Sequence, residues 1–174
     1  AELTIISSAI DVKAYSIEKE QDKNDLEVIS DQLRQASALM RDTIWTISLD
    51  KISLTQFGLK IKEFADRAFS SKNVIVHFQN TNSELNLRPE ATLNLFRIVQ
   101  EIINNSVKHS DAKNFYIKNC VANELEIVLE DDGKGFDLVT IERGYGLNNI
   151  NQRASDLGAK VNFEIEKGKH TRVK

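Results

Sequence analysis

The sequence is poor in the residues that mark secreted, membrane-spanning or nucleic-acid-binding proteins. It has one cysteine, one proline and a formal net charge of only −3 in 174 residues. The single cysteine, Cys120, cannot form an internal disulfide, and its strand-like surroundings predict a buried thiol in a reducing compartment. No apolar run approaches the roughly 20 residues that span a bilayer. The small negative charge argues against a general attraction to nucleic acid or to anionic membranes.

Glycine is also scarce, and four of the seven glycines lie in one stretch, "VLEDDGKGFDLVTIERGYGLNNI", at Gly133, Gly135, Gly144 and Gly146. Glycine permits positive φ angles and a close approach of the backbone to a ligand. The second pair precedes a predicted helix, whose free N–H groups and macrodipole favour phosphate. An ordinary turn is the alternative interpretation, since Asp and Gly are common in turns.

The pattern of apolar side chains in residues 1–50 predicts two helices. Leu3, Ile6 and Ile10 lie on one stripe of the first helix. In the second helix, apolar or small residues recur at spacings of three and four, as in a heptad seam, at positions 26, 29, 33, 36, 40, 43 and 47. A short helical hairpin cannot bury such a seam alone, so we expect it to form a four-helix bundle with a second copy. Packing of the seam on the downstream domain is the alternative.

Residues 51–174 predict an α+β domain, with a helix at 54–69, a strand at 73–80 and a helix that begins near Pro89. Two hairpin strands follow at 114–122 and 123–131, then a helix ended by Gly158, a strand at 159–167, a "GKHT" turn and a last strand from Arg172. Strands that are grouped as hairpins favour a mixed or antiparallel sheet with helices on one face.

Two groups of polar residues could carry chemistry. Glu101, Asn105 and either Lys108 or His109 share one face of a predicted helix, where an amide oxygen can bind a hard cation and an ammonium can meet an anionic oxygen. Asp131 ends a predicted strand and can accept a hydrogen bond from an exocyclic amine such as that of adenine. A solvated helix face with a salt bridge is the alternative interpretation for the first group.

The order of these motifs carries a resemblance. Residues from about 88 to 174 resemble the ATP-binding domain of sensor histidine kinases, in the wider family shared with gyrase, Hsp90 and MutL. "QEIINNSVKHS" resembles the Asn box, "EDDGKGFD" the first glycine box and "GYGLNNINQRA" the second. "GLNNINQRASDLGA" and "ASALMRDTIWTIS" are similar to the subgroup of NarX, LytS and DesK, in which a dimerisation domain precedes a short ATP lid. The implied fold is a helical hairpin at 1–50, forming a dimeric four-helix bundle, followed by a Bergerat-type α/β sandwich with a mixed sheet at 51–174.

The resemblance also implies a role for each matching residue. Asn105 would be the Mg²⁺ ligand, Glu101 would polarise the attacking nucleophile, and Asp131 would recognise adenine. The other residues implied in ATP binding are Lys108, His109, Gly133, Gly135, Gly144, Gly146, Leu147 and Thr171. In the final motif, "GKHT", His170 stands where the family usually has glycine, which places the local turn in doubt.

A histidine kinase also needs a phosphoacceptor, and none of the three histidines, His77, His109 and His170, lies in a predicted dimerisation helix. We therefore expect the acceptor to lie upstream of Ala1. The implied function is transfer of the γ-phosphate of Mg·ATP to that histidine and then to a response-regulator aspartate. The implied partners are a second copy and the regulator's receiver domain, and the implied location is cytoplasmic, within a membrane-anchored parent. The alternatives are a non-catalytic interaction module and a gyrase- or Hsp90-like ATPase.

Overall fold

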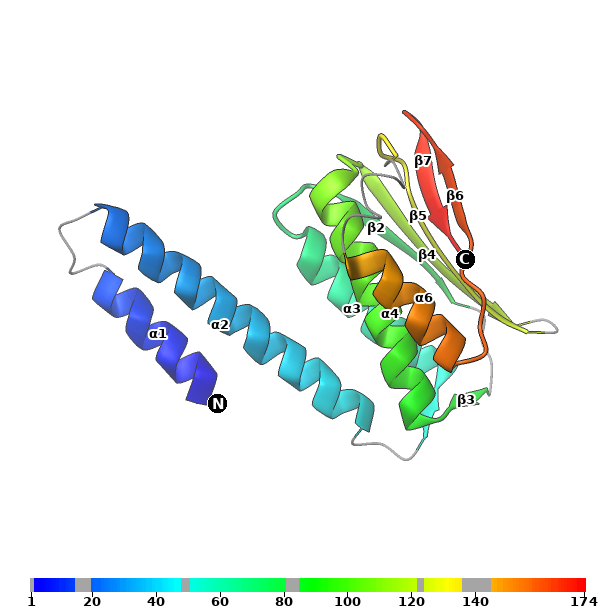
Figure 1. The fold of residues 1–174 in the computed structure, drawn as a ribbon, viewed down its shortest axis with the longest axis horizontal. Helices are drawn as coiled ribbons and strands as arrows, with labels where there is room; N and C mark the ends of the chain where they lie inside the picture. The colour runs from blue at the N-terminus through cyan, green and yellow to red at the C-terminus, as the bar shows by residue number, and fades with distance from the viewer. Residues whose placement is uncertain (1, 15–19, 48–50, 81–84, 122–123, 136–144) are drawn as a thin grey trace. The chain divides into compact units, whose positions relative to one another are not determined.

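The computed structural model describes residues 2–14, 20–47, 51–80, 85–121, 124–135 and 145–174. The chain divides into two compact units, Ala1–Ser48 and Leu49–Lys174 (Figure 1). Each unit is described by itself below.

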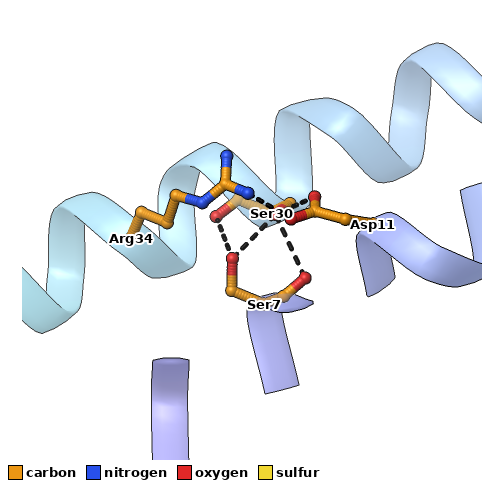
Figure 2. A network of polar contacts seen from close by, with 4 residues as sticks. All are labelled: Ser7, Asp11, Ser30 and Arg34. Carbon is orange, nitrogen blue, oxygen red and sulfur yellow. Dashed lines mark hydrogen bonds and ion pairs between the residues drawn. The ribbon is translucent and has the colours of Figure 1, made fainter. Parts of the chain in front are cut away.

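The first unit consists of helices α1 (Glu2–Ala14) and α2 (Glu20–Ile47), which lie side by side (Figure 1). Polar side chains make a central contact between them (Figure 2). Ser7 and Ser30 are buried, with their Oγ atoms 2.8 Å apart. The Ser30 hydroxyl also lies 2.6 Å from Asp11 Oδ1, and Arg34 pairs with Asp11. Serine is small enough to let the two backbones approach closely at this point.

The predicted heptad seam of α2 is only partly covered within this unit. Ile29 and Met40 are 44% and 56% exposed, and Ile6 of α1 is 48% exposed. Buried serines occupy the centre of the contact between α1 and α2, and these apolar side chains are left exposed. A row of apolar side chains remains open to solvent on the two helices.

The second unit is an α+β domain with a mixed sheet, as predicted from the grouping of its strands. Strands β2 (Ile75–Asn80), β4 (Asn114–Val121), β5 (Leu125–Asp131), β7 (His170–Val173) and β6 (Phe163–Glu166) form a sheet in that spatial order. β2 pairs parallel to β4, and the other neighbours pair antiparallel. A small sheet joins β1 (Ile52–Ser53) to β3 (Asn86–Leu87), which the sequence pattern did not predict.

Helices α3 (Leu54–Phe69), α4 (Pro89–His109) and α6 (Tyr145–Asp156) cover one face of the five-stranded sheet (Figure 1). Local signals explain their limits. Ser53 and Gln56 form a capping box at the start of α3, Pro89 occupies the first turn of α4, and Gly158 has a φ of 65° just after α6. The phenylalanines Phe57, Phe96 and Phe115 are almost fully buried between helices and sheet. The core therefore lies between these two layers.

Two local predictions are wrong. His170 and Thr171 were expected in a turn, but β7 begins at His170, and the positive φ of 84° belongs to Gly168. Glycine is thus available where the turn needs it, and His170 adopts strand geometry paired with Glu166. Cys120 is half-buried rather than buried, and its thiol lies 3.5 Å from the Glu126 carboxylate across the β4–β5 hairpin.

Candidate nucleotide-binding site

The candidate site is centred on Asp131, the last residue of β5, whose side chain is directed towards the helices. Asp131 is only 3% exposed and pairs in register with Phe115 of β4 and Thr171 of β7. Its Oδ1 accepts the N–H of Gly133 at 3.1 Å, and the Ser106 hydroxyl of α4 hydrogen-bonds its carboxylate. The carboxylate is therefore held in one orientation by a backbone donor and a side-chain donor.

Burial raises the pKa of the Asp131 carboxyl above its ordinary value. The hydrogen bonds from Gly133 and Ser106 oppose this effect, and the neighbouring charge of Asp132 adds to it. A buried carboxyl with few donors around it is a suitable acceptor for a ligand amine, because a new hydrogen bond relieves part of its desolvation.

A small cavity lies next to Asp131, with a volume of about 10 Å³, which is room for roughly one water molecule. Thr171 also lines it and is 3% exposed. Its Oγ1 is buried without a hydrogen-bond partner among the residues that the structure describes. A buried hydroxyl without a partner is costly unless water or a ligand satisfies it. The cavity is lined by Ile102, Asn105, Ser106, Phe115, Leu129, Asp131, Phe163, Thr171 and Val173.

Helix α4 supplies the other predicted polar residues. Asn105 is half-buried and lines the cavity, so the structure brings it together with Asp131 and Thr171. Glu101, one turn earlier, is directed elsewhere. A Cβ placed on Gly146 would overlap Glu101 Oε1, so this carboxylate lies against the first turn of α6. Gly146 therefore allows a close approach between α4 and α6.

Two of the predicted loop glycines are required by packing. Gly133 lies against the carbonyl oxygen of Ser110. A Cβ at this position would overlap that oxygen, which leaves no room for a side chain. Gly135 has a φ of 67°, in the region that L side chains rarely adopt. Both glycines are buried between the end of α4 and the β6–β7 hairpin. Their freedom thus serves the close packing of the loop that follows Asp131.

The remaining predicted residues lie outside this cavity. Lys108 and His109 are exposed at the end of α4. Leu147 is 7% exposed and packs in an apolar cluster with Ile98, Ile150 and Ala154, where it anchors α6 to α4. Gly144 lies outside the described residues.

Sequence reasoning missed Ser106 and Ser110. Both are buried, and their Oγ atoms are hydrogen-bonded at 3.1 Å. Ser110 Oγ also accepts the N–H of Ala112 at 3.2 Å. Their signal was present, because two serines spaced by one turn fall on the apolar side of the predicted helix, and buried hydroxyls need partners.

The described residues contain no group of three or more His, Cys, Asp or Glu side chains that could hold a metal ion. Asn105 offers one amide oxygen, which suits an ion that keeps several waters and binds substrate phosphates, as Mg²⁺ does. Within the described ranges, no helix has the length and apolar character that crossing a membrane requires.

Comparison with known proteins agrees with this geometry. The family of histidine kinase-, DNA gyrase B-, and HSP90-like ATPases matches residues 90–174. A sensor-like histidine kinase of Chloroflexus aurantiacus is 25% identical over 183 residues, covering 95% of this chain and 30% of its own length. UhpB of Salmonella typhimurium, a signal transduction histidine-protein kinase/phosphatase, is 30% identical over 126 residues, covering 72% of this chain and 24% of its own length. The chain thus spans less than a third of the length of these relatives.

Solved structures share the fold. The histidine kinase domain of a blue-light activated histidine kinase from Erythrobacter litoralis EL346 has a TM-score of 0.60 at 16% identity, covering 99% of this chain and 93% of that domain. Full-length ShkA in complex with AMPPNP has a TM-score of 0.64 at 12% identity, covering 99% of this chain and 44% of that one. The second unit therefore has the fold of histidine kinase-type ATPase domains. Residues 90–174 carry the ATPase domain of the histidine kinase-, DNA gyrase B-, and HSP90-like family, and the chain is similar to sensor histidine kinases.

Proposed function

We propose that the second unit binds ATP in the cleft between α4 and the sheet, with Asp131 accepting a hydrogen bond from the adenine amine. The observation that carries the proposal is the pairing of Asp131 with Thr171 across β5 and β7, beside a cavity of about one water. The Thr171 hydroxyl lacks a partner among the described residues and would be satisfied by a water that also meets the base. The similarly folded ShkA was solved with AMPPNP, which supports a nucleotide in this fold.

Asn105 fits a role in holding Mg²⁺ at this site. Asn105 lines the same cavity as Asp131, and its amide oxygen could hold an ion that also binds the phosphates. When bound, Mg²⁺ would neutralise phosphate charge during phosphoryl transfer. Glu101 lies one turn before Asn105 on α4 and would orient the attacking nucleophile through its carboxylate. Lys108 and His109, exposed at the end of α4, would approach the phosphates, and Gly146 would contribute to the lid over them.

The proposed reaction is transfer of the γ-phosphate to a histidine imidazole, and later to an aspartate of a response regulator. Neither α1 nor α2 contains any of the three histidines. His77 lies in β2, His109 ends α4 and His170 begins β7. The proposed transfer therefore needs a histidine that these two helices do not supply. The exposed apolar side chains of α1 and α2, such as Val28 and Ile44, would pair with a second copy in a four-helix bundle.

The proposal is tested by titrating Mg·ATP and Mg·ADP into the chain in a calorimeter, and by supplying a helical hairpin that carries a histidine. We expect nucleotide binding and an acid-labile phosphate on the supplied hairpin. Absence of any binding heat would favour a non-catalytic module. Steady ATP hydrolysis without an acceptor would favour a gyrase- or Hsp90-like ATPase, and an acid-labile phosphate on the chain itself would show that the acceptor is misplaced.

A further inference from the structure

Asp132 makes contacts that differ from those of its neighbour Asp131. Its side chain is exposed on the opposite face of the chain, yet both of its oxygens are engaged. Oδ1 accepts the backbone N–H groups of Lys113 and Asn114, each at 2.8 Å, and Oδ2 accepts the Asn114 side-chain amide at 2.7 Å. The N–H of Asp132 donates to the Asn114 carbonyl at 3.2 Å. One residue thus joins the loop after β5 to the start of β4 four times.

The network continues to the edge strand β2. The other end of the Asn114 amide, Oδ1, lies 2.8 Å from His77 Nε2, and the His77 ring stacks on Tyr116 with centroids 4.6 Å apart. The Asn114 amide is therefore oriented from both sides, with its NH₂ towards Asp132 and its oxygen towards His77. This arrangement fixes Asp132 to two strands rather than to a flexible loop.

The residues that Asp132 binds, Lys113 and Asn114, follow shortly after the end of α4, the helix that carries Asn105. The segment from the end of α4 to Asn114 therefore faces the Asp131 loop. The same loop contacts this segment at three further points. The Lys134 ammonium pairs with Asp111 Oδ2 at 2.6 Å. The N–H of Lys134 donates to the Ser110 carbonyl at 2.8 Å, and Gly133 packs directly against that carbonyl. Because Gly133 donates to Asp131, a shift of the loop relative to Ser110 would turn the Asp131 carboxylate.

We propose that Asp132 is a positioning residue that holds the Asp131 loop against the end of α4 and thereby sets the base selectivity of the nucleotide site. This inference rests on the proposed ATP-binding function. Asp132 acts through backbone N–H groups and through Gly133, and it does not itself meet the nucleotide. The hydrogen bonds also keep Asp132 charged: burial acts to raise the pKa of its carboxyl, but the bonds from Asn114 and Lys113 lower it below its ordinary value.

The test compares the dissociation constants of ADP and GDP for the chain and its variants by calorimetry. The ratio of the two constants reports base selectivity and is unaffected by the fraction of folded protein, since unfolding weakens both equally. We expect Asp132→Ala to reduce the preference for ADP by about tenfold, which corresponds to ~1.4 kcal/mol. If Asp132→Ala does not fold, Asp132→Asn, which keeps one acceptor oxygen for the backbone, is measured instead with the same criterion.

Two further variants separate positioning from general effects. Glu124→Gln is the matched control, because it removes one exposed carboxylate from the same domain and leaves the hydrogen bonds of Asp132 intact. The exchange of Asp132→Asn with Asn114→Asp restores a carboxylate–amide pair, so we expect it to recover most of the selectivity.

The outcomes distinguish the two proposals. If the unchanged chain does not prefer ADP, the proposed function is wrong and this inference falls with it. If the unchanged chain prefers ADP and Asp132→Ala retains the same ratio, only the role of Asp132 is overturned. An equal loss of selectivity in Glu124→Gln would likewise overturn it, because it would point to net charge rather than to position.

Discussion

Replacing Asp131 with asparagine should separate nucleotide recognition from stability. The asparagine side chain would occupy the same volume, and its oxygen could still accept the Gly133 N–H. Its NH₂ group could donate to Ser106 Oγ, which also interacts with the carboxylate. The fold should therefore be retained. The adenine amine, however, would meet a donor instead of an acceptor.

The magnitude follows from the burial of the site. Asp131 is 3% exposed, so a base amine left without an acceptor there would not be satisfied by bulk water. An unsatisfied buried polar group costs about 1–3 kcal/mol. At ~1.4 kcal/mol for each factor of ten, adenine nucleotides should bind roughly 5- to 150-fold more weakly. Guanine nucleotides, which carry an oxygen at the matching ring position, should lose much less.

At neutral pH, Asp131→Asn should weaken adenine binding without lowering the free energy of unfolding. Burial raises the pKa of Asp131 in the folded state above its unfolded value, so the folded chain binds this proton more tightly. The stability that results is complete below the unfolded pKa and is lost as pH rises through the folded pKa. At pH 7 the buried, ionised carboxylate destabilises the folded parent, and the Asp131→Asn variant lacks this charge. The variant should therefore be at least as stable as the parent at this pH. Below about pH 4, the unfolded value for Asp, the parent should gain relative to the variant.

Calorimetric titration with ADP and GDP at about pH 7.5, together with thermal unfolding from about pH 3.5 to about pH 7.5, measures both effects on either side of the unfolded pKa of Asp. The midpoint difference between parent and variant cancels the contributions of all other titrating groups. Equal ADP affinity in parent and variant would remove Asp131 from the base site. The reasoning about burial would be wrong if Asp131→Asn unfolds at a lower temperature than the parent at neutral pH and the difference between them does not grow in acid.

Three other predictions concern separate parts of the chain. Asn105→Ala should abolish Mg²⁺-dependent phosphorylation of a supplied histidine hairpin while circular dichroism stays unchanged; retained activity would refute the metal role. Gly133→Ala should lower the unfolding temperature by several degrees, because its Cβ would overlap the backbone carbonyl of Ser110, which cannot rotate away; equal midpoints in Gly133→Ala and parent would show that the loop yields freely. Cysteines at positions 7 and 30, with the native cysteine removed, should cross-link on oxidation, because the Ser7 and Ser30 oxygens are 2.8 Å apart; no intramolecular product on a gel would contradict the pairing of α1 with α2.

The helices and strands with a clear repeating pattern were predictable, because that pattern is local in sequence. Alternating Val76 and Phe78 predicted β2, and Pro89 predicted the start of α4. The strand grouping also predicted a mixed sheet. What could not be predicted was register between distant strands. Thr171 was expected in a turn. The resemblance alone linked it to Asp131, and the pairing of β5 with β7 sets the two residues opposite each other.

The missed residues share one physical property. Ser106 and Ser110 are small polar residues on the apolar side of the predicted helix, and the partners of their hydroxyls depend on what packs against them. Ser7 and Ser30 were missed for the same reason, because the apolar seam gives no sign of the hydroxyls that meet between α1 and α2. Propensity and periodicity describe side-chain type along one helix, whereas buried polar contacts are decided by the partner element.

The position of β7 has a consequence for how the second unit assembles as it leaves the ribosome. β7 follows β6 in the sequence, yet in the sheet it lies between β5 and β6. β6 therefore has no neighbour to join until residues 170–173 have been synthesised. Until then β5 exposes an open edge at Asp131, so a nascent chain should be unable to retain nucleotide. A ligand-dependent gain in protease resistance should consequently appear only in translation products that extend past Val173.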